Sequence, residues 1–425
     1  MITKHSHGLW GQTASPPPET ETLAADILVD VAVIGAGYTG LSTALHLGQR
    51  GVNCAVLEAS DIGSGAAGRA TGMVNAGLWV MPSALREVLG PIYGRRMLNL
   101  LRNSPRIVFD LIDKFDIQCE AKHAGTIHCA VGKRGVAEIE ERTRQWQALG
   151  APIHLLDREE TSAKTGSKAF VLSLLDLRAG TVQPLSYVRG LSNIATACGV
   201  KVYTHSPVQT IIRESQQWRL RTQLGSVLAK WVLVSTDVYT SGIAPELRTG
   251  QVAMPFFHVA TTPLDPEILR TILPEGHGAW DTRVPMTAFR TDVAGRLIIG
   301  SVGALRGTGT AIHRSWAKRR MQALFPQLGK IEIEQSWYGL IGTTGDHMPR
   351  IHSLAENMIA LTGFNGRGIA PGTLFGRELA RYILGEVAPE DMFLPFSAPE
   401  EAPLRALKEG YYELGAQIAH LPPLR

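Results

Sequence analysis

The chain has 425 residues, of which 44% are hydrophobic and 19% charged, which is enough for two or three domains with substantial cores. Its 42 basic and 38 acidic residues give a net charge of only +4 without a long basic run, which argues against nucleic acid as a partner. No segment approaches the roughly 18 apolar residues of a membrane span, and the N-terminal residues lack the apolar core of a signal peptide. The 4 cysteines are scattered without a C-x-x-C pair, so we expect reduced thiols in a cytoplasmic protein without a metal centre.

The first predicted element follows an irregular, proline-rich N-terminal arm over residues 1–27. Residues 31–34 are apolar and of strand type, and they lead into Gly35, Gly37 and Gly40, after which the chain continues at helical spacing. In such a strand-turn-helix unit the first glycine lets the backbone turn, the second lets a pyrophosphate approach the amides, and the third lets helix and strand pack closely. The helix N-terminus then faces the anion.

An acidic residue at the expected distance supports this dinucleotide fingerprint. Residues 53–60 form a second strand pattern that includes Glu58, about 20 residues past the glycines, where a carboxylate accepts hydrogen bonds from ribose hydroxyls. A second G-x-G-x-x-G, formed by Gly63, Gly65 and Gly68, has no strand before it. The alternative is a structural strand-turn-helix with a surface glutamate. Because strand, spacing and acid occur together, the sequence favours a nucleotide site.

The rest of the chain alternates between small-residue loops, helical stretches and strand patterns. Residues 61–78 are rich in glycine and alanine, which suits a backbone that lies against a flat ligand. Residues 85–160 are mainly helical, with one strand pattern at 125–131. Strand and helix patterns return over 179–236, and strands dominate 245–335, where a D-x-x-G turn predicts a hairpin.

A second glycine-rich loop, at residues 361–372, lies far from the first in sequence and precedes another helical stretch. Together with the leading fingerprint, Glu58, the IGSGAAGRATG stretch at 62–72 and a W-x-G…T-x-D-x-x-P signature, it resembles the FAD-dependent D-amino acid oxidase superfamily, and within it the gamma-glutamylputrescine oxidase-like group. The signature is formed by Trp337, Gly339, Thr344, Asp346 and Pro349. The resemblance extends from about residue 8 to about residue 390.

This resemblance implies a mixed α/β fold of the glutathione reductase-2 type. A Rossmann-type FAD-binding domain would be interleaved with a substrate domain built from a β-sheet and helices. The expected boundaries are 1–27 for the N-terminal arm; 28–85, 179–244 and 336–395 for the FAD-binding domain; 86–178 and 245–335 for the substrate or cap domain; and 396–425 for a C-terminal helical tail.

The resemblance also implies which residues hold FAD. The first glycine turn would contact the pyrophosphate, the acid and its neighbours the adenosine ribose, the second loop the pyrophosphate and flavin, and the late loop the flavin ring. The residues so assigned are Gly35, Gly37, Tyr38, Thr39, Gly40, Glu58, Ala59, Ser60, Gly68, Arg69, Ala70, Thr71, Gly72, Val208, Thr236, Gly339, Asn365, Gly366, Arg367, Gly368, Ile369 and Ala370. FAD is expected to be bound non-covalently, because no cysteine or histidine occupies a position that matches a linkage.

Three residues of the second loop depart from the G-A-S-G-R-N-G-G pattern that is usual in this group. Ala67 replaces a serine and removes a hydroxyl that could bond a phosphate, whereas Ala70 replaces an asparagine and Thr71 a glycine close to the flavin. These changes make the group's substrate an unsafe guide to the substrate of this chain.

Redox chemistry in such a protein resides in the flavin, so the protein has to bind, orient and polarise. The amides of residues 365–370, before a helix, are suited to stabilise the negative charge that develops on the ring as an amine is oxidised. No catalytic side chain is assigned, since the amine has only to arrive neutral. The candidate substrate residues are Met73, Asn75, Arg290 and His347. Arg290 could hold a carboxylate, and the alternative is a surface arginine. His347 could face the edge of the flavin, and the alternative is a packed histidine.

The expected function is FAD-dependent oxidation of the C–N bond of an amine or amino acid to an imine, by hydride transfer to flavin N5, with O2 as the expected acceptor and H2O2 as the product. An ω-amine or a gamma-glutamylated polyamine is favoured as the substrate, followed by cyclic or D-amino acids. The alternatives are a dehydrogenase that passes electrons to a quinone or carrier protein, a pyridine-nucleotide-dependent flavoprotein, and an inactive FAD-binding protein.

Overall fold

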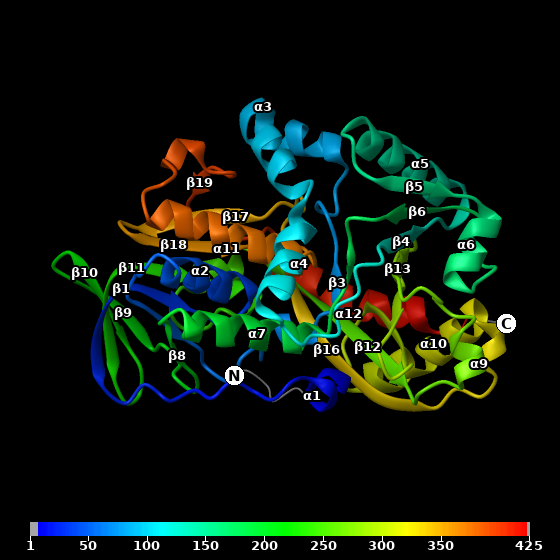
Figure 1. Ribbon diagram of the computed structural model, residues 1–425, viewed down its shortest axis with the longest axis horizontal. Helices are drawn as coiled ribbons and strands as arrows, with labels where there is room; N and C mark the ends of the chain where they lie inside the picture. Colours follow the sequence, from blue (N-terminus) through cyan, green and yellow to red (C-terminus); the bar gives the residue numbers. More distant parts are fainter. Residues whose placement is uncertain (1–6, 423–425) are drawn as a thin grey trace.

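The computed structural model describes residues 7–422 and contains two large β-sheets that lie side by side (Figure 1). Residues 1–6 of the predicted arm and 423–425 of the predicted tail lie outside the described residues. In Figure 1 the nine-stranded sheet and its helices occupy the left half of the view and the eight-stranded sheet the right half. Residues from both sheets line the cavity described below.

The nine-stranded sheet is organised around β1 (Asp26–Ile34). β1 pairs in parallel with β2 (Cys54–Leu57) on one side and with β11 (Ser226–Val234) on the other. β8 (Lys201–Tyr203) extends the sheet beyond β2, and β18 (Met358–Thr362) extends it beyond β11, again in parallel. Because parallel strands point the same way, the carboxyl ends of β1, β2 and β11 meet at one edge.

Antiparallel pairs complete this sheet on both sides. β9 and β10 form a hairpin that pairs with β11, and β17 pairs with β18 and with β19. The bounds are β9 Thr210–Glu214, β10 Gln217–Arg221, β17 Arg350–Ala355 and β19 Phe396–Ser397.

Three helices cover one face of the nine-stranded sheet. Successive residues of β1 point to opposite faces. Val31 and Val33 therefore belong to the cluster on the helix side, with Leu41, whereas Ala32 belongs to the cluster that contains Trp218 of the hairpin. The helices are α2 (Tyr38–Gly48), α7 (Pro184–Ala197) and α11 (Ile369–Ile383).

The eight-stranded sheet has the order β16-β12-β15-β14-β13-β4-β6-β5, and its pairs are antiparallel except β4 with β13. One face packs on α10 (Thr308–Leu324), where Phe257 contacts the cluster that contains Met321. The opposite face carries Phe256 and Trp280. The bounds are β4 Thr126–Cys129, β5 Ile153–Leu156, β6 Ser173–Asp176, β12 Val252–Thr261, β13 Gly278–Asp281, β14 Ala288–Thr291, β15 Leu297–Val302 and β16 Ile333–Thr343.

The remaining helices connect or cover these sheets. α4 packs on α11, α5 packs on β5 and β6, and α12 packs on β12 and α10 (Figure 1). The bounds are α1 Leu9–Thr13, α3 Pro82–Leu101, α4 Ser104–Phe115, α5 Gly132–Ala148, α6 Arg158–Thr165, α8 Pro245–Thr249, α9 Pro266–Leu269 and α12 Arg405–His420. A short ribbon pairs β3 (Met73–Val74) with β7 (Gly180–Thr181). Among residues 7–422 no helix is both long and apolar enough to cross a membrane.

Most predicted elements are present, with two differences near the N-terminus and one at residues 153–156, where β5 interrupts the stretch predicted as helical. The strand predicted at 31–34 begins at residue 26, and the arm contains α1, where Leu9 and Trp10 are fully buried. The hairpin at the D-x-x-G turn joins β14 to β15 as predicted. The domain boundaries stay a prediction; residues 336–343 lie in β16 and pair with β12 in the eight-stranded sheet.

Candidate active site

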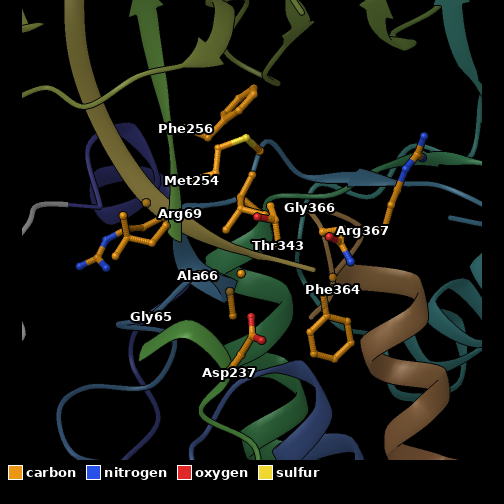
Figure 2. Close-up of a pocket in the computed structure, with 18 of the residues that line it drawn as sticks. Gly65, Ala66, Arg69, Asp237, Met254, Phe256, Thr343, Phe364, Gly366 and Arg367 are labelled. Atoms are coloured by element: carbon orange, nitrogen blue, oxygen red, sulfur yellow. The ribbon is translucent and has the colours of Figure 1, made fainter. Parts of the chain in front are cut away.

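Loops at the ends of both sheets enclose a large cavity of about 910 Å³. It extends from Glu58, at the end of β2, to Arg367, just before α11. Figure 2 shows its middle, with Asp237 on the side of the nine-stranded sheet and Met254 and Phe256 of β12 on the opposite side. The cavity therefore joins the dinucleotide fingerprint to the inner face of the eight-stranded sheet.

The glycine turn between β1 and α2 forms part of the cavity wall. Gly35 has a φ of 101°, which L side chains rarely adopt. A Cβ on Gly40 would lie 2.1 Å from the Gly35 carbonyl oxygen and 2.5 Å from Ser235 Oγ, so glycine is needed there for close packing. A Cβ on Gly37 would meet no atom within 4 Å, and no side chain caps the first turn of α2. Its amides therefore face open space and are suited to bind an anion.

The predicted acid lies where a ribose would be expected. Glu58 accepts hydrogen bonds from the backbone amides of Ala36, at 2.9 Å, and Ser60, at 3.0 Å. These bonds fix the carboxylate beside the glycine turn, and burial raises the pKa of Glu58. Each carboxylate oxygen keeps a further lone pair for a ligand hydroxyl.

The small-residue loop over residues 61–78 is held from outside by two indole groups. Trp10 Nε1 donates to the Ala70 carbonyl at 2.9 Å, and Trp337 Nε1 donates to the Arg69 carbonyl at 3.2 Å. The two rings contact each other edge to face, with centroids 5.5 Å apart. The N-terminal arm and β16 thus fix the loop that lines the middle of the cavity.

The late glycine loop is tied to both sheets. Asn365 Oδ1 accepts the amide hydrogen of Thr344 at 2.9 Å, next to the end of β16. The Gly363 amide donates to Asp237 Oδ1 at 2.8 Å, which joins the loop to the end of β11. Burial raises the pKa of Asp237 to about 6. α11 then begins without a side-chain cap at Gly368, so that free amides face the cavity.

Beyond this loop the cavity opens into an aromatic chamber, which we define by Trp79, His128, Trp280 and Arg367. The Arg367 guanidinium lies over the rings of Trp79, 4.5 Å from the centroid, and Trp280, 4.9 Å from the centroid. His128 stacks on Trp280 with ring centroids 4.9 Å apart. The other chamber walls are apolar side chains of Met73, Met254, Phe256, Met286, Val302 and Ile341.

The chamber carries a buried positive charge that no carboxylate of the described residues contacts directly. Arg367 is only 8% exposed, and within residues 7–422 it forms no ion pair. Burial, with a smaller contribution from the nearby Arg142, lowers the pKa of Arg367 to about 9, and the charge of Asp176 partly opposes this shift. Burial and the same arginines hold the pKa of His128 well below its usual value, so its imidazole is neutral. A buried cation in this setting is stabilised when an anion enters.

Comparison with known proteins decides the family. The family model for DAO, described as FAD dependent oxidoreductase, matches residues 30–382. This chain belongs to the DAO family of FAD-dependent oxidoreductases. The predicted family, fold class and cofactor are thereby confirmed.

Several curated proteins and solved structures are similar to the chain over most of its length. Gamma-glutamylputrescine oxidoreductase from Escherichia coli strain K12 is 27% identical over 424 residues, which cover 97% of this chain and 99% of that protein. Glycine oxidase from Geobacillus kaustophilus superposes with a TM-score of 0.67 at 19% identity, over 84% of this chain and 95% of that one. L-Amino acid deaminase from Proteus myxofaciens superposes with a TM-score of 0.72 at 15% identity, over 88% of this chain and 93% of that one.

The cavity fits the FAD that this family binds. The uncapped amides of α2 beside Gly37 offer a pyrophosphate site, Glu58 a ribose site, and the amides near Gly368 a site for the polar edge of the flavin. Small side chains between these points leave the space that a long, partly flat cofactor needs.

Most residues assigned to the cofactor or substrate from the sequence line this cavity. Five of them do not: Gly40, Ser60, Gly68, Ala370 and Arg290. The first four are sequence neighbours of residues that line it. Met73 and Asn75 line the cavity, and Asn75 Oδ1 accepts the Thr126 hydroxyl hydrogen at 2.7 Å. His347 lies at the cavity rim, exposed to solvent in a tight turn.

Two of the unusual loop residues have partners within the protein. The Ala67 carbonyl accepts the Tyr38 hydroxyl hydrogen at 2.7 Å, so the backbone at this position is engaged even without a serine. Thr71 Oγ1 lies 2.9 Å from Nε2 of His258, whose pKa burial lowers to about 3. The threonine thus holds a neutral histidine at the cavity wall, a role that glycine could not fill.

The structure places Arg290 away from the cavity. It is 2% exposed, and its Nη1 donates to the backbone carbonyls of Val182, at 2.6 Å, and Gly72, at 3.2 Å. Its guanidinium therefore ties the second loop to the segment before α7. We infer a structural role for Arg290 in place of the carboxylate-binding role suggested by the sequence.

Replacing Arg290 with methionine is expected to lower the free energy of unfolding by about 3 kcal/mol, because the buried Val182 carbonyl loses its donor and the Gly72 carbonyl keeps only the Val182 amide. Denaturant titration would measure the loss, while the KM for substrate of the folded fraction should stay within about twofold. Arg86→Met on the exposed surface of α3 is the control, with an expected change below about 0.5 kcal/mol. Normal stability combined with a raised KM would restore Arg290 to the substrate site.

Several cavity residues could not be found from local sequence patterns. They are Trp79, His128, Phe256 and Trp280 of the chamber walls and Tyr411, Tyr412, Gly415, Ala416 and Ala419 of α12. None of these residues belongs to a glycine loop or a motif. For α12 the available signal was its moderately amphipathic pattern, which predicted a helix but no role.

Proposed function

We propose that this protein oxidises the C–N bond of an amine that also carries an anionic group, such as an amino acid or an acylated ω-amine, to the imine, with O2 as the electron acceptor. The observation that carries the proposal is Arg367, a buried cation without a carboxylate partner among residues 7–422, held between two indoles in a chamber that opens directly onto the cofactor cavity. A substrate carboxylate would supply a direct ion-pair partner for this guanidinium.

The side chains of the chamber support this chemistry in three ways. Arg367 would fix the anionic end of the substrate and so orient its amine toward the loop at residues 365–370. The positive charges of Arg367 and Arg142 disfavour a protonated amine, which helps it to lose its proton before oxidation. The apolar walls around Phe256 exclude water and so slow hydrolysis until the imine leaves.

Bound FAD supplies the redox chemistry, since it takes up the hydrogen and electron pair from the carbon beside the amine nitrogen. The neutral His128 and His258 are not required as bases, and no described side chain is assigned a proton-transfer step. The name of the Escherichia coli relative, gamma-glutamylputrescine oxidoreductase, suggests an acylated ω-amine as the first substrate to try, and glycine oxidase suggests small amino acids.

The test is an anaerobic screen that follows bleaching of the flavin absorbance. Each amine that carries a carboxylate is paired with the analogue in which that carboxylate is a carboxamide, for example gamma-glutamylputrescine with its α-carboxamide, and an amino acid with its amide. The anionic member should bleach the flavin at least about 100-fold faster at limiting concentration. Equal rates for both members would contradict the assignment of Arg367.

A second step separates the acceptors. Turnover in air with stoichiometric peroxide supports O2 as the acceptor. Reduction of an artificial dye without peroxide would instead assign the protein as a dehydrogenase that uses a quinone or carrier protein. Heat denaturation should release the flavin into solution, as expected for non-covalent binding, and retention of the colour by the precipitate would contradict that expectation.

A further inference from the structure

The C-terminal helix α12 presents two faces of opposite character. Its inner face is fixed to the protein: Glu409 accepts from Arg248 at 2.8 Å and from the Ala253 amide at 3.0 Å, and His420 Nδ1 lies 2.9 Å from His313 Nδ1. Arg306 and Thr308 hold the same face through Glu413 and Gln417. The helix is therefore held rigidly, and its outer face projects in a defined direction.

The outer face of α12 carries an apolar stripe, which we define as Leu407, Tyr411, Leu414 and Ile418, with 69%, 73%, 62% and 71% of each side chain exposed, respectively. Leu404 and Leu421, 70% and 51% exposed, flank the helix at its two ends with non-helical backbone. The stripe residues are spaced four, three and four apart, which is the a/d pattern of a helix that packs against another helix. On an ordinary surface helix the apolar stripe faces the protein core, whereas here it faces away.

We propose that α12 pairs with α12 of a second copy of this chain in an antiparallel arrangement across a two-fold axis. With the axis between residues 412 and 413, Leu407 faces Ile418 and Tyr411 faces Leu414, and Leu404 comes to the same end of the pair as Leu421 of the second copy. Every stripe residue then meets another stripe residue, so one helix face is fully complementary to itself, as a two-fold interface requires.

The flanks of the stripe are compatible with such a pair. Lys408 is the charged residue beside the stripe, and in an antiparallel pair it lies on the same flank as Gly415 of the second copy, so no like charges meet. Gly410, on the other flank, has no side chain and lets the helix backbones approach closely beside the tyrosine. At roughly 100 Å² for each side chain, the stripe and the two flanking leucines would bury about 600 Å² per copy, close to the about 800 Å² per partner of a standard interface.

A lipid surface fits this helix less well. Helices that lie on membranes carry lysine and arginine along the polar face, whereas the polar face of α12 contains Glu409 and Glu413 and is already bound to protein. Tyr411 belongs to the stripe and also lines the cavity, so the second copy would border the outer wall of the active site. The pairing is independent of the substrate that the chamber accepts.

The test is the mass of the FAD-loaded protein in solution, by light scattering and sedimentation equilibrium. We expect twice the chain mass of 46.0 kDa for the wild type. Leu414→Glu should raise the dimer dissociation constant by at least about 100-fold. Leu224→Glu is the matched control, because Leu224 lies in the β10–β11 turn with 61% exposure against 62% for Leu414, and it should remain a dimer. Flavin content and Tm should be normal in both variants.

A charge exchange tests the register. Leu407→Lys alone should be monomeric, and Leu407→Lys with Ile418→Glu should recover the dimer, because residue 407 of one copy faces residue 418 of the other only in the antiparallel arrangement. In a parallel pair each introduced charge would face its own copy, and the double variant would stay monomeric. A monomeric wild type, or a Leu414→Glu variant that remains a dimer, would overturn the proposal.

Discussion

Substitution of Arg367 by methionine is expected to lower kcat/KM for an anionic amine by about 100-fold or more, because the substrate anion loses a buried, charge-assisted partner worth about 3 kcal/mol. The rate with the neutral analogue of the same length should change by less than about threefold, since that substrate never used the charge. Steady-state kinetics with the paired substrates would measure both effects.

The Tm of Arg367→Met distinguishes a loss of substrate binding from a loss of folded protein. Arg367 is a buried cation without a carboxylate partner among the described residues, so its removal relieves a desolvation cost, and Tm should not fall. Arg283→Met is the matched control: Arg283 also lines the cavity, but it is 49% exposed and lies 3.7 Å from Asp281. A control that loses as much activity as Arg367→Met would show that the cavity responds only to total charge.

The contrast between Arg290 and Arg367 shows what the sequence could and could not predict. Both lie in or near the segments that the sequence singled out, and Arg290 was a candidate for carboxylate binding, with a surface arginine as the alternative, because it lies on a strand of the expected substrate domain. The strand was predicted well, but the direction of a side chain depends on register, and Arg290 points to the backbone of residues 72 and 182. Arg367 was assigned to the cofactor because it lies in the late glycine loop. The two indoles that it contacts, Trp280 and Trp79, are about 90 and about 290 residues away in sequence, so no local pattern could indicate them.

Local chemistry explains why the cofactor half was easier to predict. The glycine turn, its strand and Glu58 are consecutive elements whose spacing is fixed by backbone geometry, so a short stretch of sequence contains the whole arrangement. The chamber is formed instead mainly by residues of β4, β12, β13, β15 and β16, which meet only after the eight-stranded sheet has folded. Trp79, His128 and Trp280 belong to no motif in the sequence, and only their arrangement around one guanidinium gives them a distinct role.

Gly40→Ala is expected to yield protein without FAD and with a free energy of unfolding lower by about 3 kcal/mol, because the new methyl group would lie 2.1 Å from the Gly35 carbonyl oxygen and α2 would have to move away from β1. Gly37→Ala separates packing from binding: its methyl group meets no protein atom within 4 Å, so Tm of the flavin-free protein should stay normal while FAD affinity falls. Gly345→Ala, also in open space, should retain both stability and flavin.

Flavin absorbance relative to protein absorbance, with thermal unfolding of the flavin-free form, measures all three variants. Full flavin content in Gly37→Ala would mean that the pyrophosphate does not lie at the N-terminus of α2, whereas normal stability in Gly40→Ala would mean that the turn tolerates a shift larger than its packing suggests.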